Sequence, residues 1–361
     1  MNAFIWNHRG PLQYVRQKMM EGKVTVGFLG GSITDPSPGH NWPEAVAAWL
    51  ADTYPGIRFT IENAAIGGTG SDLAVFRSKR DIIDRNCDLV FVEYAVNDGS
   101  VPEDKRMRTR EGLLRQLLAS GRDVVIVYTY DQSMFEDMAE GKVPDTIAQF
   151  ERLAEYYGIG SVWMGLYAFA EIKRGRMRWE EWLPDGLHPA SRGSFSYAAS
   201  VIAFLEKELA TPMEHNKQLL PIPQPLHERN WGHISLLDFD EVKLEGPWTI
   251  RRHATMEWID YILYTSAIGA KLSFSFKGRG LLLGFDFGKD SAEFRYRLDG
   301  GDWVTECRGR PEWANGGWFR PSFIADDLAN GVHRFEMEII HGNAAGCTGT
   351  NMRLGLIGIV Q

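Results

Sequence analysis

Residue types suited to nucleophilic catalysis stand at a few widely spaced points of the chain. Ser32 follows the glycine pair 30–31, and His188 stands three residues after Asp185 in a turn-like segment. A serine hydroxyl becomes a strong nucleophile only when a base takes its proton, and histidine titrates near neutral pH. A carboxylate three residues earlier in a turn can reach the second ring nitrogen and fix its tautomer. Ser32, His188 and Asp185 are therefore a candidate triad for acyl transfer.

Acyl transfer also needs hydrogen-bond donors for the oxyanion of the tetrahedral intermediate. Each such donor lowers the barrier by about 3 kcal/mol. The side-chain amide of Asn97 and the backbone N–H groups of Gly68 and Ser32 are the candidates, with Gly67 as the alternative to Gly68. We expect Asp98 to be structural. This chemistry requires neither a metal ion nor an organic cofactor.

The segments that carry these residues follow predicted strands. Apolar runs alternate with helical segments five times, which predicts an α/β fold with a five-stranded parallel sheet and helices on both faces. Five strands commonly take the order 2-1-3-4-5, so the carboxyl ends of neighbouring strands share one edge, where the candidate residues would converge. After a short lead-in helix over residues 1–22, the predicted strands cover residues 24–29, 57–61, 88–93, 124–129 and 159–164.

The sequence changes character after residue 212. Four prolines between residues 212 and 225 predict an extended, Pro-rich linker over residues 213–229. Beyond it, short alternating runs separated by Gly, Asp and Asn turns predict an antiparallel, jelly-roll-like β-sandwich over residues 230–361. The segment 299–302, Asp-Gly-Gly-Asp, is a hairpin signal. We therefore expect a catalytic domain over residues 1–212, a linker and a sandwich domain.

Four blocks of the sequence resemble those of the SGNH hydrolases, also called GDSL-type esterases, across roughly residues 22–210. Two positions depart from the pattern of that superfamily: Gly31 replaces an acidic residue, and Ala95 replaces a glycine. The four blocks are residues 31–34 (Gly-Ser-Ile-Thr), 63–68 (Asn-Ala-Ala-Ile-Gly-Gly), 96–98 (Val-Asn-Asp) and 185–189 (Asp-Gly-Leu-His-Pro).

This resemblance implies a flavodoxin-like sheet and a serine esterase with Ser32 as nucleophile and Gly68 and Asn97 in the oxyanion hole. Superfamily members that pair this domain with a β-sandwich include acetylxylan-type esterases. The resemblance therefore implies an enzyme that removes short acyl groups, acetyl above all, from carbohydrate. We expect acetylated xylo-oligosaccharides as substrates.

Three residues near the predicted sheet edge are candidates for substrate binding. Trp182 precedes the Asp185 turn, and Tyr130 and Asp131 end the fourth predicted strand. Aromatic rings suit the apolar faces of sugars. The alternative for Trp179 and Trp182 is packing against the sheet at helical spacing.

Composition excludes several classes of partner. The net charge of −8 makes the chain a poor ligand for nucleic acid or an anionic membrane. The sequence contains no long uncharged apolar run, so we expect no membrane span. Residues 1–16 lack the apolar core of a signal peptide, so we expect a cytoplasmic protein. The three cysteines predict free thiols, with a Cys307–Cys347 disulfide as the alternative.

Two other functions remain open from the sequence. One is a lipid-type acylhydrolase, or lysophospholipase, which would need a wide apolar acyl pocket. The other is a carbohydrate-binding or assembly protein with a degenerate site, in which the sandwich binds sugar or builds a homo-oligomer. The complete set of Ser32, Gly68, Asn97, Asp185 and His188 favours the esterase over this last hypothesis.

Overall fold

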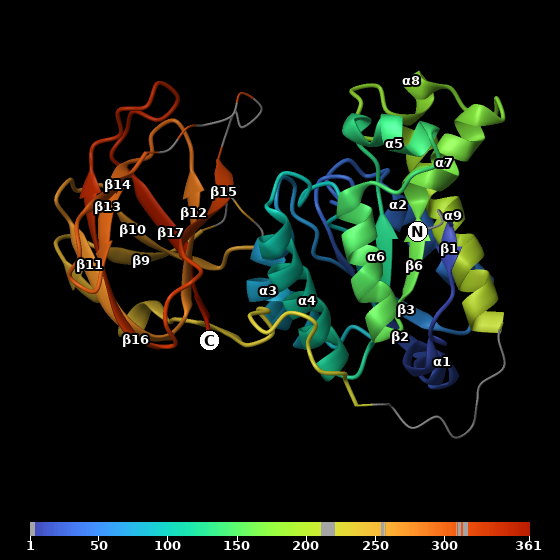
Figure 1. Cartoon of the computed structure of the whole chain (residues 1–361), viewed down its shortest axis with the longest axis horizontal. Coiled ribbons are helices and arrows are strands. Elements are labelled where there is room, and N and C mark those ends of the chain that lie inside the picture. Colours follow the sequence, from blue (N-terminus) through green and yellow to red (C-terminus); the bar gives the residue numbers. More distant parts are fainter. Residues whose placement is uncertain are drawn as a thin grey trace. The chain divides into compact units, whose positions relative to one another are not determined.

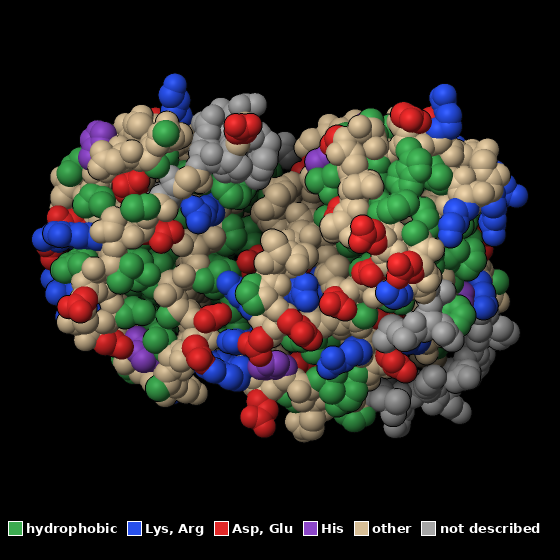
Figure 2. Space-filling view, turned by 45° about the horizontal axis from the view of Figure 1, so that its top comes forward, with side chains coloured by type: hydrophobic (Ala, Val, Ile, Leu, Met, Phe, Trp, Pro, Cys, Tyr) green, Lys and Arg blue, Asp and Glu red, His purple; other side chains and the backbone are tan. Residues whose placement is uncertain are grey.

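The computed structural model describes residues 4–210, 221–253, 256, 258–307, 309, 312 and 317–361 (Figure 1). The chain divides into two compact units, Met1–Gly232 and His233–Gln361. The first unit mixes helices with a central sheet, and the second consists mainly of antiparallel strands. Figure 2 shows acidic and basic side chains interspersed over the face in view.

A six-stranded sheet forms the centre of the first unit. Five strands are parallel and lie in the order β3-β2-β4-β5-β6, which confirms the predicted 2-1-3-4-5 arrangement. The sixth, β1, pairs antiparallel with β6 at the edge. The bounds are β1 (Trp6–Asn7), β2 (Lys23–Leu29), β3 (Arg58–Asn63), β4 (Leu89–Val92), β5 (Asp123–Tyr128) and β6 (Gly160–Trp163).

The predicted lead-in helix over residues 1–22 is only partly correct. The helix is limited to α1 (Gln13–Met20), because Gly10 and Pro11 separate it from the residues before. Those earlier residues form β1, where the ring N–H of Trp6 donates to the carbonyl of Ser200 at 2.8 Å. The short strand covers the edge of β6 that would otherwise present unpaired backbone groups.

Helices cover both faces of this sheet. The strands β2, β4, β5 and β6 are buried at almost every position, as expected for strands enclosed on both sides. The helices α2 and α7 both pack against α9, and α3 and α6 both pack against α4. The bounds are α2 (Trp42–Thr53), α3 (Ser71–Ser78), α4 (Glu103–Ala119), α5 (Phe135–Ala139), α6 (Asp145–Tyr157), α7 (Met164–Lys173), α8 (Trp179–Trp182) and α9 (Ser191–Ala210).

The second unit is a sandwich of two antiparallel sheets, as predicted. One sheet has the order β15-β12-β17-β10-β9, with β7 also paired to β17, and the other has the order β14-β13-β16-β11-β8. Its core contains apolar side chains from both sheets, such as Phe285 and Phe335. The bounds are β7 (Ile234–Leu236), β8 (Lys243–Glu245), β9 (Thr249–Arg252), β10 (Tyr261–Thr265), β11 (Lys271–Gly278), β12 (Gly280–Phe287), β13 (Glu293–Leu298), β14 (Val304–Glu306), β15 (Trp318–Ala325), β16 (Gly331–Ile340) and β17 (Met352–Val360).

The hairpin expected at residues 299–302 joins β13 to β14. Asp299 and Gly300 both have positive φ values, 52° and 71°, as a tight hairpin turn requires.

The described part of the Pro-rich segment packs on the first unit. The carboxylate of Glu111 accepts hydrogen bonds from the backbone N–H groups of Leu226 and His227, at 2.6 and 2.8 Å. Trp231 is 1% exposed and packs against Phe76, with ring centroids 5.8 Å apart. Residues 211–220 of the predicted linker region lie outside the described residues.

All three cysteines are free thiols, so the alternative Cys307–Cys347 disulfide does not form in this structure. Among the described residues, no helix is both long and apolar enough to cross a membrane.

Candidate active site

Ser32 lies directly after β2, in a tight turn at the carboxyl edge of the parallel sheet. The N–H groups of Thr34 and Asp35 both donate to the carbonyl of Gly31 at 3.0 Å, which folds the chain back around the serine. The turn then leads through a short loop into α2, whose first turn contains Pro43 and Glu44. This location is where open α/β sheets bind ligands.

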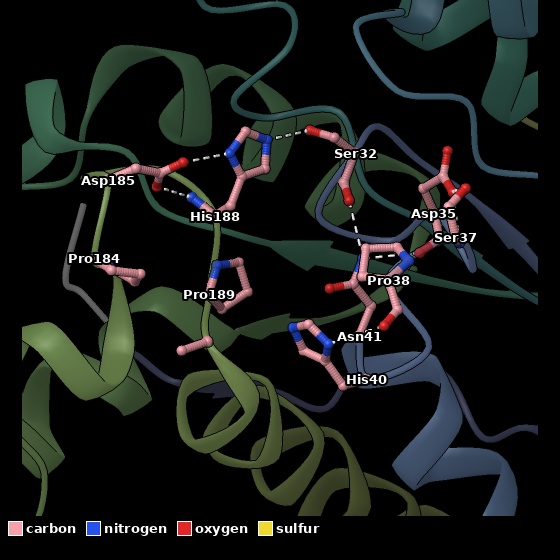
Figure 3. Close-up of a pocket in the computed structure, with 11 residues that line it drawn as sticks. Ser32, Asp35, Ser37, Pro38, His40, Asn41, Pro184, Asp185, His188 and Pro189 are labelled. Carbon is pink, nitrogen blue, oxygen red and sulfur yellow. Dashed lines mark hydrogen bonds and ion pairs between the residues drawn. The ribbon is translucent and has the colours of Figure 1, made fainter.

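Three side chains form a continuous hydrogen-bonded chain at this edge (Figure 3). The hydroxyl of Ser32 lies 2.8 Å from Nε2 of His188. Nδ1 of the same ring lies 2.7 Å from Oδ2 of Asp185. A carboxylate only accepts, so Nδ1 carries the proton, and Nε2 is the ring nitrogen that can accept a proton from the serine. The arrangement is that of a nucleophile, a base and an orienting carboxylate.

Hydrogen bonds from its own turn keep the carboxyl of Asp185 in the ionised form, which accepts hydrogen bonds. Burial raises its pKa, but hydrogen bonds from the His188 side chain and from the N–H groups of His188 and Leu187 outweigh burial, and the net pKa lies below the usual value. The carboxylate therefore stays ionised at neutral pH. Both side chains remain accessible, at 47% for His188 and 54% for Asp185.

Gly67 and Gly68 are the two neighbouring glycines whose backbone N–H groups are candidate donors to an oxyanion. The N–H of Gly67 donates to Asp35 at 3.2 Å, whereas that of Gly68 has no acceptor in the described part of the chain. Gly68 has φ of +71°, a conformation that glycine adopts without strain. This geometry favours Gly68 over Gly67 as the donor.

The turn of residues 31–35 that contains Ser32 is called the nucleophile turn below. The side-chain amide of Asn97 lies against it. A Cβ added at Gly31 would stand 2.0 Å from Oδ1 of Asn97. A side chain at position 31, where related motifs have an acidic residue, would therefore force the Asn97 amide to move. The absence of a side chain lets the Asn97 amide approach the backbone beside Ser32.

A buried ion pair supports the Asn97 loop. Asp98, which we expected to be structural, accepts from Nε of Arg110 at 2.7 Å and from the N–H of Ser71 at 2.9 Å. The guanidinium of Arg110 also donates to the carbonyls of Tyr94 and Thr146. These bonds fix the backbone on either side of Asn97 and satisfy both buried charges.

Sequence reasoning missed Glu93, whose carboxyl lies beneath the nucleophile turn. It accepts from the Gly31 N–H at 3.4 Å, from the Thr34 hydroxyl at 3.2 Å and from the Thr129 hydroxyl at 2.7 Å. Burial raises the pKa of Glu93, and these hydrogen bonds oppose the rise. A single acidic residue at the end of the apolar run 89–92 was the available signal.

A cleft of about 650 Å³ opens beside the serine (Figure 3). Ser32, His188 and Asp185 belong to its wall. Its lining comes from two segments, residues 32–41 and 184–190, and includes Asp35 and His40, which the sequence analysis did not single out.

The residues expected to bind substrate are not in this lining. Trp182 and Tyr130 are both 0% exposed and pack on each other, with ring centroids 4.6 Å apart. Trp179 stacks on Trp182, which supports the packing alternative. Asp131 caps the following helical turn by accepting from the N–H of Ser133 at 2.8 Å. We therefore leave these residues out of the proposed substrate contacts.

Comparison with known proteins identifies the first unit. Residues 28–194 match the model of the GDSL-like lipase/acylhydrolase family. The search of curated proteins gave no significant match. A crystal structure of CEX, a two-domain esterase active on acetylated mannans, superimposes with a TM-score of 0.82 at 22% identity, covering 98% of this chain and 96% of that one.

The same esterase co-crystallised with mannopentaose gives a TM-score of 0.81 at 22% identity and the same coverage. A variant of Axe2, an acetyl xylan esterase from Geobacillus stearothermophilus, gives 0.43 at 18% identity, covering 54% of this chain and 97% of that one. The likeness to CEX, with a TM-score of 0.82 at 22% identity, shows a shared fold and does not show the substrate of this chain. Residues 28–194 form a domain of the GDSL-like lipase/acylhydrolase family, and the chain is a carboxylic ester hydrolase.

Proposed function

We propose that this enzyme removes acetyl groups from oligosaccharides through a covalent acyl-enzyme on Ser32. The hydrogen-bonded chain from Ser32 through His188 to Asp185 is the observation that carries the proposal. His188 is the general base and general acid, and Asp185 holds its ring in the required tautomer.

In the first half-reaction, the Ser32 oxygen attacks the ester carbonyl carbon while His188 Nε2 takes the hydroxyl proton. The carbonyl oxygen becomes an oxyanion, which the N–H groups of Ser32 and Gly68 and the Asn97 amide stabilise. The bond to the sugar oxygen then breaks, and His188 returns its proton to that oxygen. The free sugar hydroxyl leaves, and an acetyl group remains on Ser32.

In the second half-reaction, water takes the place of the departed alcohol. His188 removes a proton from this water, whose oxygen attacks the acetyl carbon. Collapse of the second tetrahedral intermediate releases acetate and returns the proton to the Ser32 oxygen. Each proton transfer in both half-reactions runs through the same ring nitrogen, Nε2 of His188.

The carbohydrate part of the proposal has two supports. The motif resemblance suggests acetylated xylo-oligosaccharides, and a protein of the same two-unit fold acts on acetylated mannans. Both oligosaccharide types have neutral sugars as the leaving alcohol. We therefore propose a neutral acetylated oligosaccharide, and the choice between xylose and mannose chains is left to experiment.

The test is the initial rate on p-nitrophenyl acetate, butyrate and octanoate, followed by acetylated xylo- and manno-oligosaccharides. We expect the rate to fall with acyl length and Ser32→Ala to abolish it. Ser100→Ala, at an exposed serine outside the cleft, is the matched control. A rate that rises towards octanoate would favour a lipid acylhydrolase instead, and turnover by Ser32→Ala would refute the mechanism.

A further inference from the structure

The cleft lies on the side of Ser32 where the leaving alcohol must be. The group that protonates the leaving oxygen has to reach it within hydrogen-bond distance. His188 is in the cleft wall, whereas Gly68 and Asn97, the candidate donors to the oxyanion, are not in its lining. Its volume of about 650 Å³ is also far more than an acetyl group fills, and lies within the range usual for ligand pockets.

The charge of the cleft restricts which alcohol it accepts. Two carboxylates, Asp35 and Asp185, line it, and neither Lys nor Arg is among the described residues of the lining. An anionic alcohol, such as a glycerophosphate headgroup or a uronate, would meet repulsion without a compensating cation. A neutral polyol carries hydroxyl donors that carboxylate oxygens accept.

His40 adds a second acceptor on the same wall. Its Nδ1 lies 3.0 Å from the carbonyl of Pro38. A carbonyl only accepts, so Nδ1 carries a proton, and Nε2 has the lone pair whenever the ring is in its neutral form. Figure 3 shows one ring nitrogen turned to Pro38 and the other away from it. No partner for Nε2 is found in the part of the chain that the structure describes.

Hydrogen bonds hold both ends of the loop that carries the two acceptors. The side-chain amide of Asn41, 3% exposed, donates to the carbonyls of Ser32 and Asp35 at 2.9 and 2.8 Å. The carboxylate of Asp35 accepts from the N–H groups of Ser37 and Gly67. These bonds tie Asp35 and Asn41 to the segments beside Ser32, which lowers the cost of ordering the Asp35 carboxylate on binding.

Three prolines complete the wall with apolar surface. Pro38, Pro184 and Pro189 line the cleft from its two segments. Their rings can pack on the C–H faces of a pyranose, which needs apolar contacts beside a few placed polar groups.

From these features we propose that the 35–41 loop is a recognition site for the leaving sugar, in which Asp35 and His40 accept hydrogen bonds from hydroxyls of a neutral monosaccharide unit. The proposal rests on the proposed function and makes it more specific. It assigns to Asp35 the selectivity for neutral over anionic leaving alcohols. It assigns to His40 the selectivity for leaving alcohols that have further hydroxyl groups over those that have none.

The test for His40 compares two substrates that share an acetyl group. p-Nitrophenyl acetate has no sugar hydroxyl, whereas an acetylated xylo- or manno-oligosaccharide has several. In His40→Leu, the ratio of kcat/KM for oligosaccharide to that for aryl acetate should fall about three- to tenfold, as expected for one lost hydrogen bond. A ratio within about twofold of the wild-type ratio would overturn the role of His40, because one lost hydrogen bond should change it by more than that.

The test for Asp35 adds an anionic substrate, an acetylated oligogalacturonide. Asp35→Asn should raise kcat/KM for this substrate relative to the neutral oligosaccharide by about three- to tenfold. The ratio cancels any loss from the Gly67 bond, which affects both substrates alike. Asp52→Asn removes an exposed carboxylate on α2 outside the cleft and should leave the ratio unchanged.

Ser32→Ala, assayed in parallel, separates the two levels of the proposal. If it loses all turnover while Asp35→Asn leaves selectivity unchanged, the recognition site is wrong and the esterase mechanism stands. If it keeps its turnover, the proposed function itself fails.

Discussion

At the scale of single residues, the site depends on where side chains are absent as much as on where they are present. Ser32, His188 and Asp185 are linked by two hydrogen bonds of 2.8 and 2.7 Å. Beside them, the bare Cα of Gly31 makes room for the Asn97 amide. The absence of a side chain at position 31 therefore explains how the Asn97 amide can lie so close to the backbone beside Ser32.

Gly31→Ala tests that explanation. The new methyl group would overlap Oδ1 of Asn97 and push the amide away from the nucleophile turn, so kcat on p-nitrophenyl acetate should fall about 10²- to 10³-fold. At Gly67 an added Cβ would meet Ser32 Cβ at 3.6 Å, an ordinary contact, so Gly67→Ala should keep kcat within about threefold. Equal effects of the two changes would contradict the account.

At the scale of secondary-structure elements, the segment that directly follows β4 organises the site. Residues 93–98 contain the Glu93 carboxyl beneath the nucleophile turn, the Asn97 amide and the Asp98 carboxylate. Glu93 and Asp98 are 0% and 1% exposed, and both accept hydrogen bonds from neighbouring segments. They therefore anchor the backbone on both sides of the amide, and one short segment sets the position of Asn97 beside the nucleophile.

Arg110→Met tests the support under the Asn97 loop. Arg110 and Asp98 are 0% and 1% exposed, so loss of the guanidinium leaves a buried carboxylate without its partner. The free energy of unfolding should fall by about 3–5 kcal/mol in urea denaturation. Lys79→Met breaks the exposed Lys79–Asp84 pair and should cost less than about 1 kcal/mol. Similar losses in both variants would contradict this account.

Glu93→Gln tests the buried carboxyl through pH. The pKa of Glu93 is raised in the folded protein, so the unfolded chain loses this proton first as pH rises above about 4.3. The folded state then binds more protons, and wild-type stability should fall relative to Glu93→Gln as pH rises, by up to about 1.4 kcal/mol per pH unit. A stability difference between the two proteins that does not change between about pH 4 and pH 7 would contradict the raised pKa.

At the scale of the whole molecule, the sequence was most informative where local pattern and topology agree. The parallel strands, their order and the sandwich followed from apolar runs and turn residues such as Asp299 and Gly300. Contacts between distant segments were not predictable in this way. Trp182 and Tyr130 are buried by tertiary packing that spacing alone does not specify, and the cleft wall of Asp35 and His40 depends on how a loop folds back.

Contacts between distant segments also decide where the first unit ends, at residue 232. Because Trp231 is buried against Phe76, a fragment that ends at residue 232 should melt at a higher temperature than one that ends at residue 212. Loss of a buried tryptophan costs about 3–5 kcal/mol, which thermal unfolding of the two fragments would detect. Equal melting temperatures would show that residues 221–232 add nothing to this unit.

The most direct test of the central claim is covalent labelling with a fluorophosphonate, which reacts with serines activated by a neighbouring base. The account predicts one label per chain, located on the peptide that contains Ser32, with loss of esterase activity in proportion to labelling. His188→Ala, which removes the base 2.8 Å from the hydroxyl, should abolish labelling. A label on another serine, or full labelling of Ser32→Ala, would contradict the assignment of Ser32 as the nucleophile.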